Sequence, residues 1–410
     1  MLGKTILFVL LGMLFLACGE EKEAAPPPER EVPASDEPMS FWNQQRKGTN
    51  YFNGTPTREW FLAAAEANIR LIRLTFEKWQ GEERDFLMGD ADDYQGLVEE
   101  DWLVLKRYLD LADSLDLNIV ITPISLPGDR WRQSNDNQRD GRLWKQEAFR
   151  SAVLQYWTDL ATRLKAQPAV VGYNLVNEPH PEVYYGKFDF WDEGFSEWYQ
   201  SVQGGPGDLN RFNREVVAAI REVDSLMPIV VESGLFGTPW AFTYLKPLED
   251  ERIIYSFHMY EPYPYTTKRI NQGRFGYPGN LFIEGLGDTF TMNRENLAAF
   301  FDPVRAWATQ HQIPANRLWV GEFGCNRHVE GVEAYLRDLI QVFNEDEWHW
   351  SFYSYREDTW EAMDYELGTG RVPHRYWEYQ ENGSLHQHYP EIYRNRPGTF
   401  WDLFSQEFQP

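Results

Sequence analysis

The feature that most constrains the fold is a regular alternation of short, strand-forming apolar runs with longer segments of helical period. Eight runs predict strands: 46–52, 69–75, 118–123, 170–176, 229–233, 252–257, 318–321 and 348–353. Helices are predicted over 58–67, 102–114, 147–165, 209–226, 293–311 and 332–344, with only a short one, about 241–245, between the fifth and sixth strands. Apolar strands alternating with helices are typical of a parallel sheet that helices cover.

Eight strand–helix units favour one α/β architecture, a single closed (β/α)8 barrel of the TIM-barrel type. An open, doubly wound sheet is the alternative. Its main sequence signal is missing, because no Gly-rich phosphate loop follows the first strand. Residues 41–410 are therefore expected to form a single barrel domain.

The first 18 residues predict a targeting segment. Lys4 gives a positive start, and residues 5–16 are an apolar run too short for a comfortable permanent membrane span. The run ends in Phe15-Leu16-Ala17-Cys18, which resembles a bacterial lipoprotein box, so Cys18 is expected to be lipidated. The chain would then be anchored by lipid in the bacterial cell envelope, at the outer membrane or the cell surface. An ordinary signal peptide with an incidental cysteine is the alternative.

Residues 19–40 are rich in Pro, Glu and Ala and predict a disordered tether, because almost no bulky apolar side chain is available to offset the ordering entropy. The net charge of −24 argues against a nucleic-acid partner. Aromatic residues make up 16% of the chain, which favours stacking on sugars once bases are disfavoured. A monomer is expected. With Cys18 lipidated, only Cys325 remains, so an internal disulfide is excluded.

Polar and charged side chains gather where the predicted strands end, which is where barrel enzymes carry their active sites. They are Arg73 on the second strand, Asn177 and Glu178 after the fourth, Glu232 on the fifth, His258 and Tyr260 at the sixth, Glu322 on the seventh, and Tyr355, Arg356 and Glu357 after the eighth. A pair of carboxylates across a barrel mouth is what cleavage of a glycosidic bond needs: one protonates the leaving oxygen, and the other attacks or activates water.

Three motifs, "LVNEP", "SFHMYEP" and "WVGEFG", resemble those of glycoside hydrolase family 5, the cellulase-like retaining enzymes. The resemblance runs from about Lys47 to the end of the eighth strand. It implies that Glu178 is the acid/base, that Glu322 is the nucleophile and that Asn177 binds the sugar 2-OH. Arg73, His258 and Tyr260 match further site positions of the family. No cofactor and no metal are expected.

Two departures from the family pattern concern the sugar pocket. Ile124 stands where the family carries a histidine after the third strand, and the tryptophan of the eighth strand is replaced by a choice of Trp350, Tyr355 and Trp360. Four tryptophans that follow strands are candidate sugar platforms: Trp79, Trp131, Trp240 and Trp360. Tyr355 is expected to bind substrate as well.

Several alternatives stay open. Glu232 either faces the mouth or forms a buried pair with an arginine, and Cys325 is expected to be a buried thiol rather than a nucleophile. The long insertion 261–293 is expected to wall the cleft. The predicted function is endo-acting hydrolysis of a β-linked polysaccharide or oligosaccharide. A mannanase, an exo-β-glycosidase, a transglycosylase and a non-catalytic carbohydrate-binding lipoprotein are the alternatives.

Overall fold

The computed structural model describes residues 38–52, 54–76, 79, 84–189, 192–282, 289–357, 362–367, 376–381, 383–384 and 400–409. The expected signal segment with Cys18, residues 19–37 of the expected tether, and Trp360 lie outside these ranges. Among the helices within them, none is long and apolar enough to cross a membrane.

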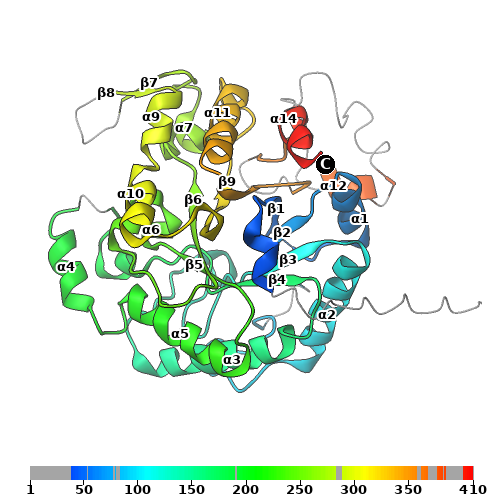
Figure 1. Cartoon of the computed structure of the whole chain (residues 1–410), viewed down its shortest axis with the longest axis vertical. Helices are drawn as coiled ribbons and strands as arrows, with labels where there is room; N and C mark the ends of the chain where they lie inside the picture. The colour runs from blue at the N-terminus through cyan, green and yellow to red at the C-terminus, as the bar shows by residue number, and fades with distance from the viewer. Residues whose placement is uncertain are drawn as a thin grey trace, which may run out of the picture. The chain divides into compact units, whose positions relative to one another are not determined.

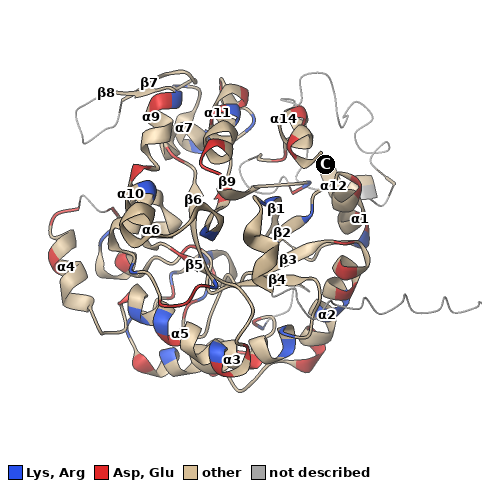
Figure 2. Cartoon of the chain, viewed as in Figure 1, with Lys and Arg blue, Asp and Glu red and all other residues tan. Residues whose placement is uncertain are grey.

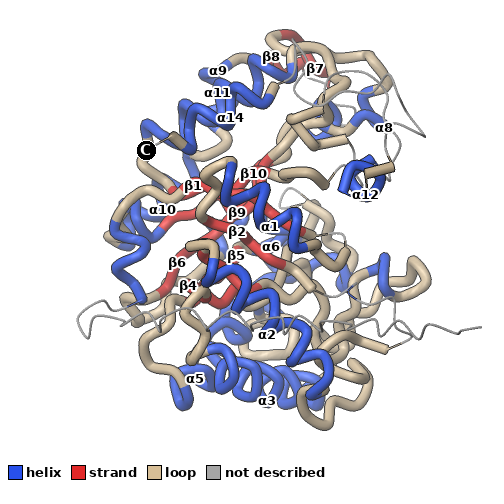
Figure 3. Tube along the Cα trace, turned by 90° about the vertical axis from the view of Figure 1, so that its right-hand side faces the viewer, coloured by secondary structure: helices blue, strands red, loops and turns tan. Residues whose placement is uncertain are grey.

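Eight parallel strands close into a barrel in the spatial order β1-β10-β9-β6-β5-β4-β3-β2. They are β1 Lys47–Tyr51, β2 Leu71–Leu74, β3 Asn118–Ile121, β4 Val170–Asn174, β5 Ile229–Glu232, β6 Ile253–Met259, β9 Leu318–Phe323 and β10 His349–Phe352. The strands lie at the centre, and helices surround them (Figures 1 and 3). Each barrel strand falls on one of the predicted runs, so the predicted (β/α)8 fold is confirmed.

The main helices pack around the barrel with their apolar faces inward. They are α1 Arg58–Glu66, α2 Glu99–Ser114, α3 Glu147–Leu164, α5 Leu209–Val223, α10 Asp302–His311 and α11 Val332–Glu345. The predicted helix 293–311 is divided into α9 Arg294–Ala299 and α10, because Pro303 lacks an N–H and starts a new helix. Between β5 and β6 the chain forms the short turn α6 Gly234–Gly237 and a 3-10 helix, Pro239–Tyr244. The remaining helices outside the insertion are α4 Phe195–Val202, α12 Tyr376–Glu381 and α14 Trp401–Ser405.

Trp42 closes the floor of the barrel. It belongs to a 3-10 helix, Pro38–Asn43, its ring is fully buried, and its Nε1 donates to the carbonyl oxygen of Val171 at 2.9 Å. It packs against inward-pointing strand residues such as Leu71 and Trp319, and Met39 packs against the same cluster. The folded domain therefore begins by Pro38, before the predicted start at 41.

The described parts of the insertion, 261–282 and 289–293, are folded and include a pair of antiparallel strands. They contain α7 Tyr263–Thr266, α8 Lys268–Asn271 and the antiparallel strands β7 Gly279–Phe282 and β8 Thr289–Met292. Tyr265 and Tyr277 are buried and pack against Tyr335 of α11. Because these aromatic rings join the core, the insertion is part of the domain, and its role as a cleft wall stays a prediction.

Lys and Arg (blue) and Asp and Glu (red) are spread over the outer helices and the loops (Figure 2). The barrel strands are almost wholly buried. Four titratable residues on the strands, Arg73, Glu232, His258 and Glu322, are buried. Burying these groups is costly unless they form hydrogen bonds or ion pairs with one another. At the mouth of the barrel they do.

Candidate active site

Glu178 follows β4 at the carboxyl end of the barrel. Pro179 prevents the strand from continuing, and Glu178 has a backbone φ of 47°, in the left-handed region that non-glycine residues seldom adopt. Its side chain keeps 18% of its surface exposed, and its Oε1 lies 2.9 Å from Nδ1 of His258. Burial raises the pKa of Glu178 above its usual value, although the neighbouring His258 acts in the opposite direction.

Glu322 lies on β9 inside the mouth, with 6% of its side chain exposed. Its Oε1 accepts a hydrogen bond from Nη1 of Arg73 at 2.5 Å, and its Oε2 accepts one from the hydroxyl of Tyr260 at 2.8 Å. Two donors, one of them a cation, thus bind the carboxylate form of Glu322 and fix its orientation.

Arg73 is fully buried on β2, and its guanidinium uses every donor. Its five hydrogen bonds go to side-chain oxygens of Asn174, Asn50, Glu322, Asn177 and Glu232, at 2.5–3.2 Å. Burial by itself lowers the pKa of Arg73, but Glu232 and Glu322 outweigh it and raise the pKa. The fork geometry of guanidinium makes Arg73 the fixed centre of the site.

His258 lies on β6 between the carboxylates. Besides its contact with Glu178, its Nδ1 is 3.7 Å from Oε2 of Glu322, and its Nε2 is 3.5 Å from Oε1 of Glu232. Burial alone would lower the pKa of His258, but the three carboxylates outweigh it and raise the pKa to about 10. These contacts favour the protonated form of His258.

The two predicted carboxylates face each other at short range. One oxygen of Glu178, one ring nitrogen of His258 and one oxygen of Glu322 all lie within 4.8 Å of one another. Retaining glycosidases hold their carboxyl groups about 5–5.5 Å apart, and inverting enzymes hold them about 6.5–9.5 Å apart. The nearer oxygens of the two carboxyl groups in this chain thus lie close together across the mouth.

Of the two readings left open for Glu232, the structure gives the buried pair with an arginine. Its Oε1 lies 2.7 Å from Nη2 of Arg73, and its Oε2 accepts the backbone N–H of Glu178 at 2.8 Å. Burial would raise the pKa of Glu232, but His258 and Arg73 outweigh it and lower the pKa to about 2.

The structure brings six of the predicted site residues together: Arg73, Asn177, Glu178, His258, Tyr260 and Glu322. Two aromatic residues that were predicted to bind substrate, Trp79 and Tyr355, do not join them. Trp79 is 1% exposed and packs edge-on against Phe76 and Tyr108, so it belongs to the core. Tyr355 is 1% exposed, and its hydroxyl donates to the carbonyl of Ala63 beneath α1.

These two positions are corrected for the same reason, since each ring is turned outward against the helices. Trp240 is half-buried in the 3-10 helix after β5 and packs against Phe300. Trp360 lies outside the described residues. Cys325 is a buried free thiol, as expected, and burial raises its pKa.

An aromatic stack beside Glu178 was missed by the sequence reasoning. The ring of His180 stacks on Phe236 at 4.3 Å and on Tyr184 at 5.4 Å, and Trp131 meets it edge-on at 5.5 Å. Trp131 was a predicted platform. The signal for His180 was its position two residues after Glu178, but nothing in the sequence showed that Phe236, after a different strand, would cover it.

The two departures from the family pattern both lie at strand ends. Ile124, in place of the strand-three histidine, is buried and apolar. Tyr353, which follows β10, is buried. Burial raises the pKa of the Tyr260 phenol most, Glu322 and Glu178 raise it further, and the nearby Tyr353 adds a smaller contribution.

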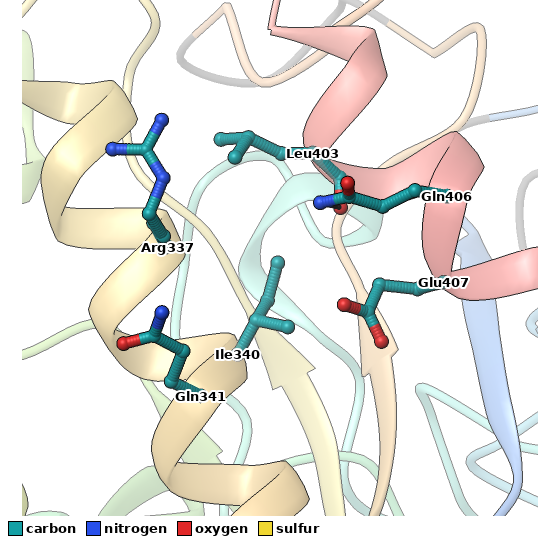
Figure 4. A pocket seen from close by; sticks show the side chains of 6 residues that line it. All are labelled: Arg337, Ile340, Gln341, Leu403, Gln406 and Glu407. Atoms are coloured by element: carbon teal, nitrogen blue, oxygen red, sulfur yellow. Dashed lines mark hydrogen bonds between the residues drawn. The ribbon is translucent and has the colours of Figure 1, made fainter.

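Two hollows lie outside this cluster. One, of about 510 Å³, adjoins Tyr184 and is lined by Arg130, Arg139, Arg142, Lys145, Asp92 and Asp140, among others. Arg130 and Arg142 are paired with aspartates, so these cations are largely compensated. The other, of about 120 Å³, lies between α11 and the C-terminal helix, away from the mouth; Figure 4 shows its lining, Arg337, Ile340, Gln341, Leu403, Gln406 and Glu407.

Comparison with known proteins adds to this geometry. The model described as cellulase (glycosyl hydrolase family 5) matches residues 32–359. Endoglucanase C of Acetivibrio thermocellus is 21% identical over 329 residues, which cover 74% of this chain and 83% of that protein.

Solved structures of low sequence identity share the fold. A protein described as a glycoside hydrolase superposes with a TM-score of 0.63 at 17% identity, over 88% of this chain and 99% of the other. Cel5A of Thermotoga maritima, in complex with mannotriose substrate, superposes with a TM-score of 0.55 at 16% identity, over 80% and 94%. Since the family model spans most of the sequence, the chain belongs to glycosyl hydrolase family 5 and is a glycoside hydrolase that cleaves β-glycans.

Proposed function

We propose that this enzyme is a retaining, endo-acting β-glucanase that works by double displacement, with Glu322 as nucleophile and Glu178 as acid/base. The observation that carries the proposal is the short separation of the two carboxyl groups, within 4.8 Å between their nearer oxygens, combined with their unlike surroundings. Glu322 receives donors from Arg73 and Tyr260, whereas Glu178 has a pKa raised by burial. One group is therefore prepared to attack and the other to donate a proton.

In the first step, an oxygen of Glu322 forms a bond to the anomeric carbon while the bond to the leaving oxygen breaks. Glu178 transfers its proton to that oxygen, so the leaving sugar departs as an alcohol. The negative charge of Glu322 disappears in the glycosyl ester, and with it one of the influences that raise the pKa of Glu178. The pKa of Glu178 then falls, so Glu178 is more readily ionised when the second step needs a base.

In the second step, Glu178 takes a proton from water, and the water oxygen attacks the anomeric carbon as Glu322 leaves. Two displacements on opposite faces return the β configuration. Asn177 would bind the sugar 2-OH. Its Oδ1 accepts a hydrogen bond from Arg73 at 2.8 Å, so its Nδ2 points away from the guanidinium.

A β-glucan is the substrate that the relatives favour, because Endoglucanase C of Acetivibrio thermocellus is among the proteins that this chain resembles. A mannan is the second candidate, since Cel5A of Thermotoga maritima was solved with mannotriose. Endo action is favoured over exo action because relatives of this chain are endoglucanases. A non-catalytic capture protein is disfavoured by the retention of both carboxylates with their partners.

A panel of soluble polysaccharides with chromatography of the products tests this proposal. Rapid loss of viscosity with a ladder of short β-glucan oligosaccharides is expected. Release of a single small sugar would indicate exo action, and turnover of mannan alone would indicate a mannanase. Longer products on addition of acceptor sugar would indicate transglycosylation by the same residues.

We further propose that Cys18 carries a lipid anchor that holds the enzyme in the bacterial envelope. The lipoprotein box and the Pro- and Glu-rich stretch after it support the proposal. Radiolabelled palmitate should enter the wild-type chain but not Cys18→Ala, and the variant should be released from the membrane fraction. Equal labelling of both would refute the anchor.

A further inference from the structure

Glu232 is a third carboxylate of the site, and neither displacement step uses it. Its side chain is completely buried at the end of β5, so it has no access to a sugar at the mouth. A fully buried carboxylate is costly unless several donors satisfy it, and it is seldom kept in a barrel interior without a task. Its partners indicate what that task is.

Both oxygens of Glu232 are engaged with groups that touch the reacting carboxylates. Oε1 accepts from Arg73 at 2.7 Å, and Arg73 in turn binds Glu322. The same oxygen lies 3.5 Å from Nε2 of His258, whose other nitrogen binds Glu178. Arg73 thus links Glu232 to Glu322, and His258 links Glu232 to Glu178.

The second oxygen of Glu232 holds the main chain of Glu178. It accepts the N–H of Glu178 at 2.8 Å, at a residue whose φ of 47° is unfavourable for a side chain. Gly237 of α6 packs over this contact: a Cβ there would stand 3.5 Å from Oε2 of Glu232 and 3.4 Å from Cγ of His258. The contact is therefore enclosed and rigid.

The charges around His258 balance only if Glu232 is ionised. Arg73 from β2, Glu178 after β4, Glu232 from β5 and Glu322 from β9 are the charged groups that meet at the imidazole and its partners, with the phenol of Tyr260 beside them. With Glu178 protonated for its role as acid, two carboxylates face two cations. Without the charge of Glu232, a net positive charge would remain and would favour either loss of the proton from His258 or ionisation of Glu178.

We propose that Glu232 is a positioning residue for the glycosidase reaction, which fixes the backbone of Glu178 and keeps His258 as an imidazolium. The proposal rests on the roles proposed above for Glu178 and Glu322. The contacts of Glu232 carry it, and the raised pKa of His258 agrees with it.

The protonation of His258 can be measured without any substrate. The intact chain is labelled with 15N-histidine, and the ring signals of His258 are assigned by comparison with His258→Gln. In the wild type, the imidazolium signals should persist to about pH 9. In Glu232→Gln the midpoint should fall by about 1–3 pH units, because one of the three carboxylates that stabilise the cation is gone. This readout remains interpretable even if the enzyme prefers a different sugar.

Glu182→Gln is the matched control. Glu182 is also a buried glutamate that accepts a backbone N–H, from Leu235 at 3.3 Å, but no contact joins it to Arg73 or His258. Its substitution should leave the His258 midpoint unchanged. An unchanged midpoint in folded Glu232→Gln, or an equal shift in Glu182→Gln, would overturn the proposal.

A kinetic readout complements the titration. With the 4-nitrophenyl glycoside of the sugar that the panel identifies, Glu232→Gln should move the alkaline limb of kcat/KM to lower pH, with KM little changed. If Glu232→Gln does not fold, Glu232→Asp is used, which keeps the charge but has a shorter reach. A wild-type His258 midpoint with a kcat reduced at least about tenfold supports the proposal; a kcat equal to that of the wild type overturns it.

Discussion

The imidazole of His258 lies between the two reacting carboxyls, 2.9 Å from Oε1 of Glu178 and 3.7 Å from Oε2 of Glu322. A buried cation in this place is stabilised by the carboxyl groups around it, and burial by itself would favour its loss. The proton on His258 is therefore linked to the stability of the fold as well as to the reaction.

The first prediction concerns this linkage. The pKa of His258 rises from 6.5 to about 10 on folding, so its protonation stabilises the folded state fully below 6.5, and the stabilisation is lost as the pH rises towards 10. Urea midpoints of the wild type should fall between about pH 6.5 and pH 10 more steeply than those of His258→Gln. Parallel pH profiles for the two proteins would contradict the assignment.

Replacing the proposed nucleophile should affect every substrate. Glu322→Gln removes the attacking oxygen, so no glycosyl-enzyme can form, whatever the leaving group. We expect kcat to fall by several orders of magnitude on both polysaccharide and aryl glycoside, with thermal unfolding close to that of the wild type. Glu182→Gln serves as the control for loss of a buried carboxyl and should retain activity.

Replacing the proposed acid/base should give a loss that depends on the leaving group. Glu178→Gln removes a proton donor, which contributes about 10²–10⁴-fold in acid–base catalysis. Dinitrophenolate leaves without a proton, so the first step with a dinitrophenyl glycoside should be nearly normal and the covalent intermediate should accumulate. Stopped-flow measurement of the dinitrophenolate burst checks this. The absence of a burst, with equal losses on activated and natural substrates, would argue against the role.

Trp131 and Trp79 were both predicted to be sugar platforms, and the structure gives opposite expectations for their substitution. Trp131 is half-buried beside the His180 stack, so Trp131→Ala should raise KM for polysaccharide and change kcat little. Trp79 is enclosed in the core, so Trp79→Ala should lower the free energy of unfolding by about 3–5 kcal/mol. Kinetics and chemical denaturation of both variants decide the matter. A Trp79→Ala variant with wild-type stability and a raised KM would instead support a sugar platform at Trp79.

The floor of the barrel predicts where the chain can be shortened. A protein that begins at Pro38 keeps Met39 and Trp42 and should match the stability and the activity of the longer chain on soluble substrate. Trp42→Ala should cost about 3–5 kcal/mol, because it leaves a cavity beneath the strands and an unpaired Val171 carbonyl. If the protein that begins at Pro38 unfolded as readily as Trp42→Ala, the boundary would lie earlier.

The barrel could be predicted from sequence because its strands are apolar on both faces and alternate with helices, a pattern that few folds share. The cluster of Arg73, Glu178, His258 and Glu322 could be predicted for a related reason: residues at the ends of parallel strands meet at one edge. Residues 38–40 of the short helix Pro38–Asn43 were assigned to the tether, since nothing local shows that Met39 packs against the floor of the barrel.

The aromatic platforms could not be predicted, because a ring that follows a strand can turn inward to the mouth or outward to the helices. Trp79 and Tyr355 turn outward and join the core. Phe236 reaches His180 only because Leu235 and Phe236 both adopt left-handed backbone conformations, which a sequence of Gly-Leu-Phe-Gly does not reveal. Glu232 was ambiguous for the same reason, since its partners lie on or after three other strands, β2, β4 and β6.

The configuration of the glycosyl azide formed by Glu178→Ala tests the central claim most directly. The smaller side chain leaves room for azide, which needs no base to attack the glycosyl-enzyme on Glu322. If Glu322 holds the sugar as an α-linked ester, azide must attack the opposite face, and proton NMR should show a β-glycosyl azide with restored turnover. An α-glycosyl azide, or rescue with Glu322→Ala that yields the β product, would contradict the assignment of the two glutamates.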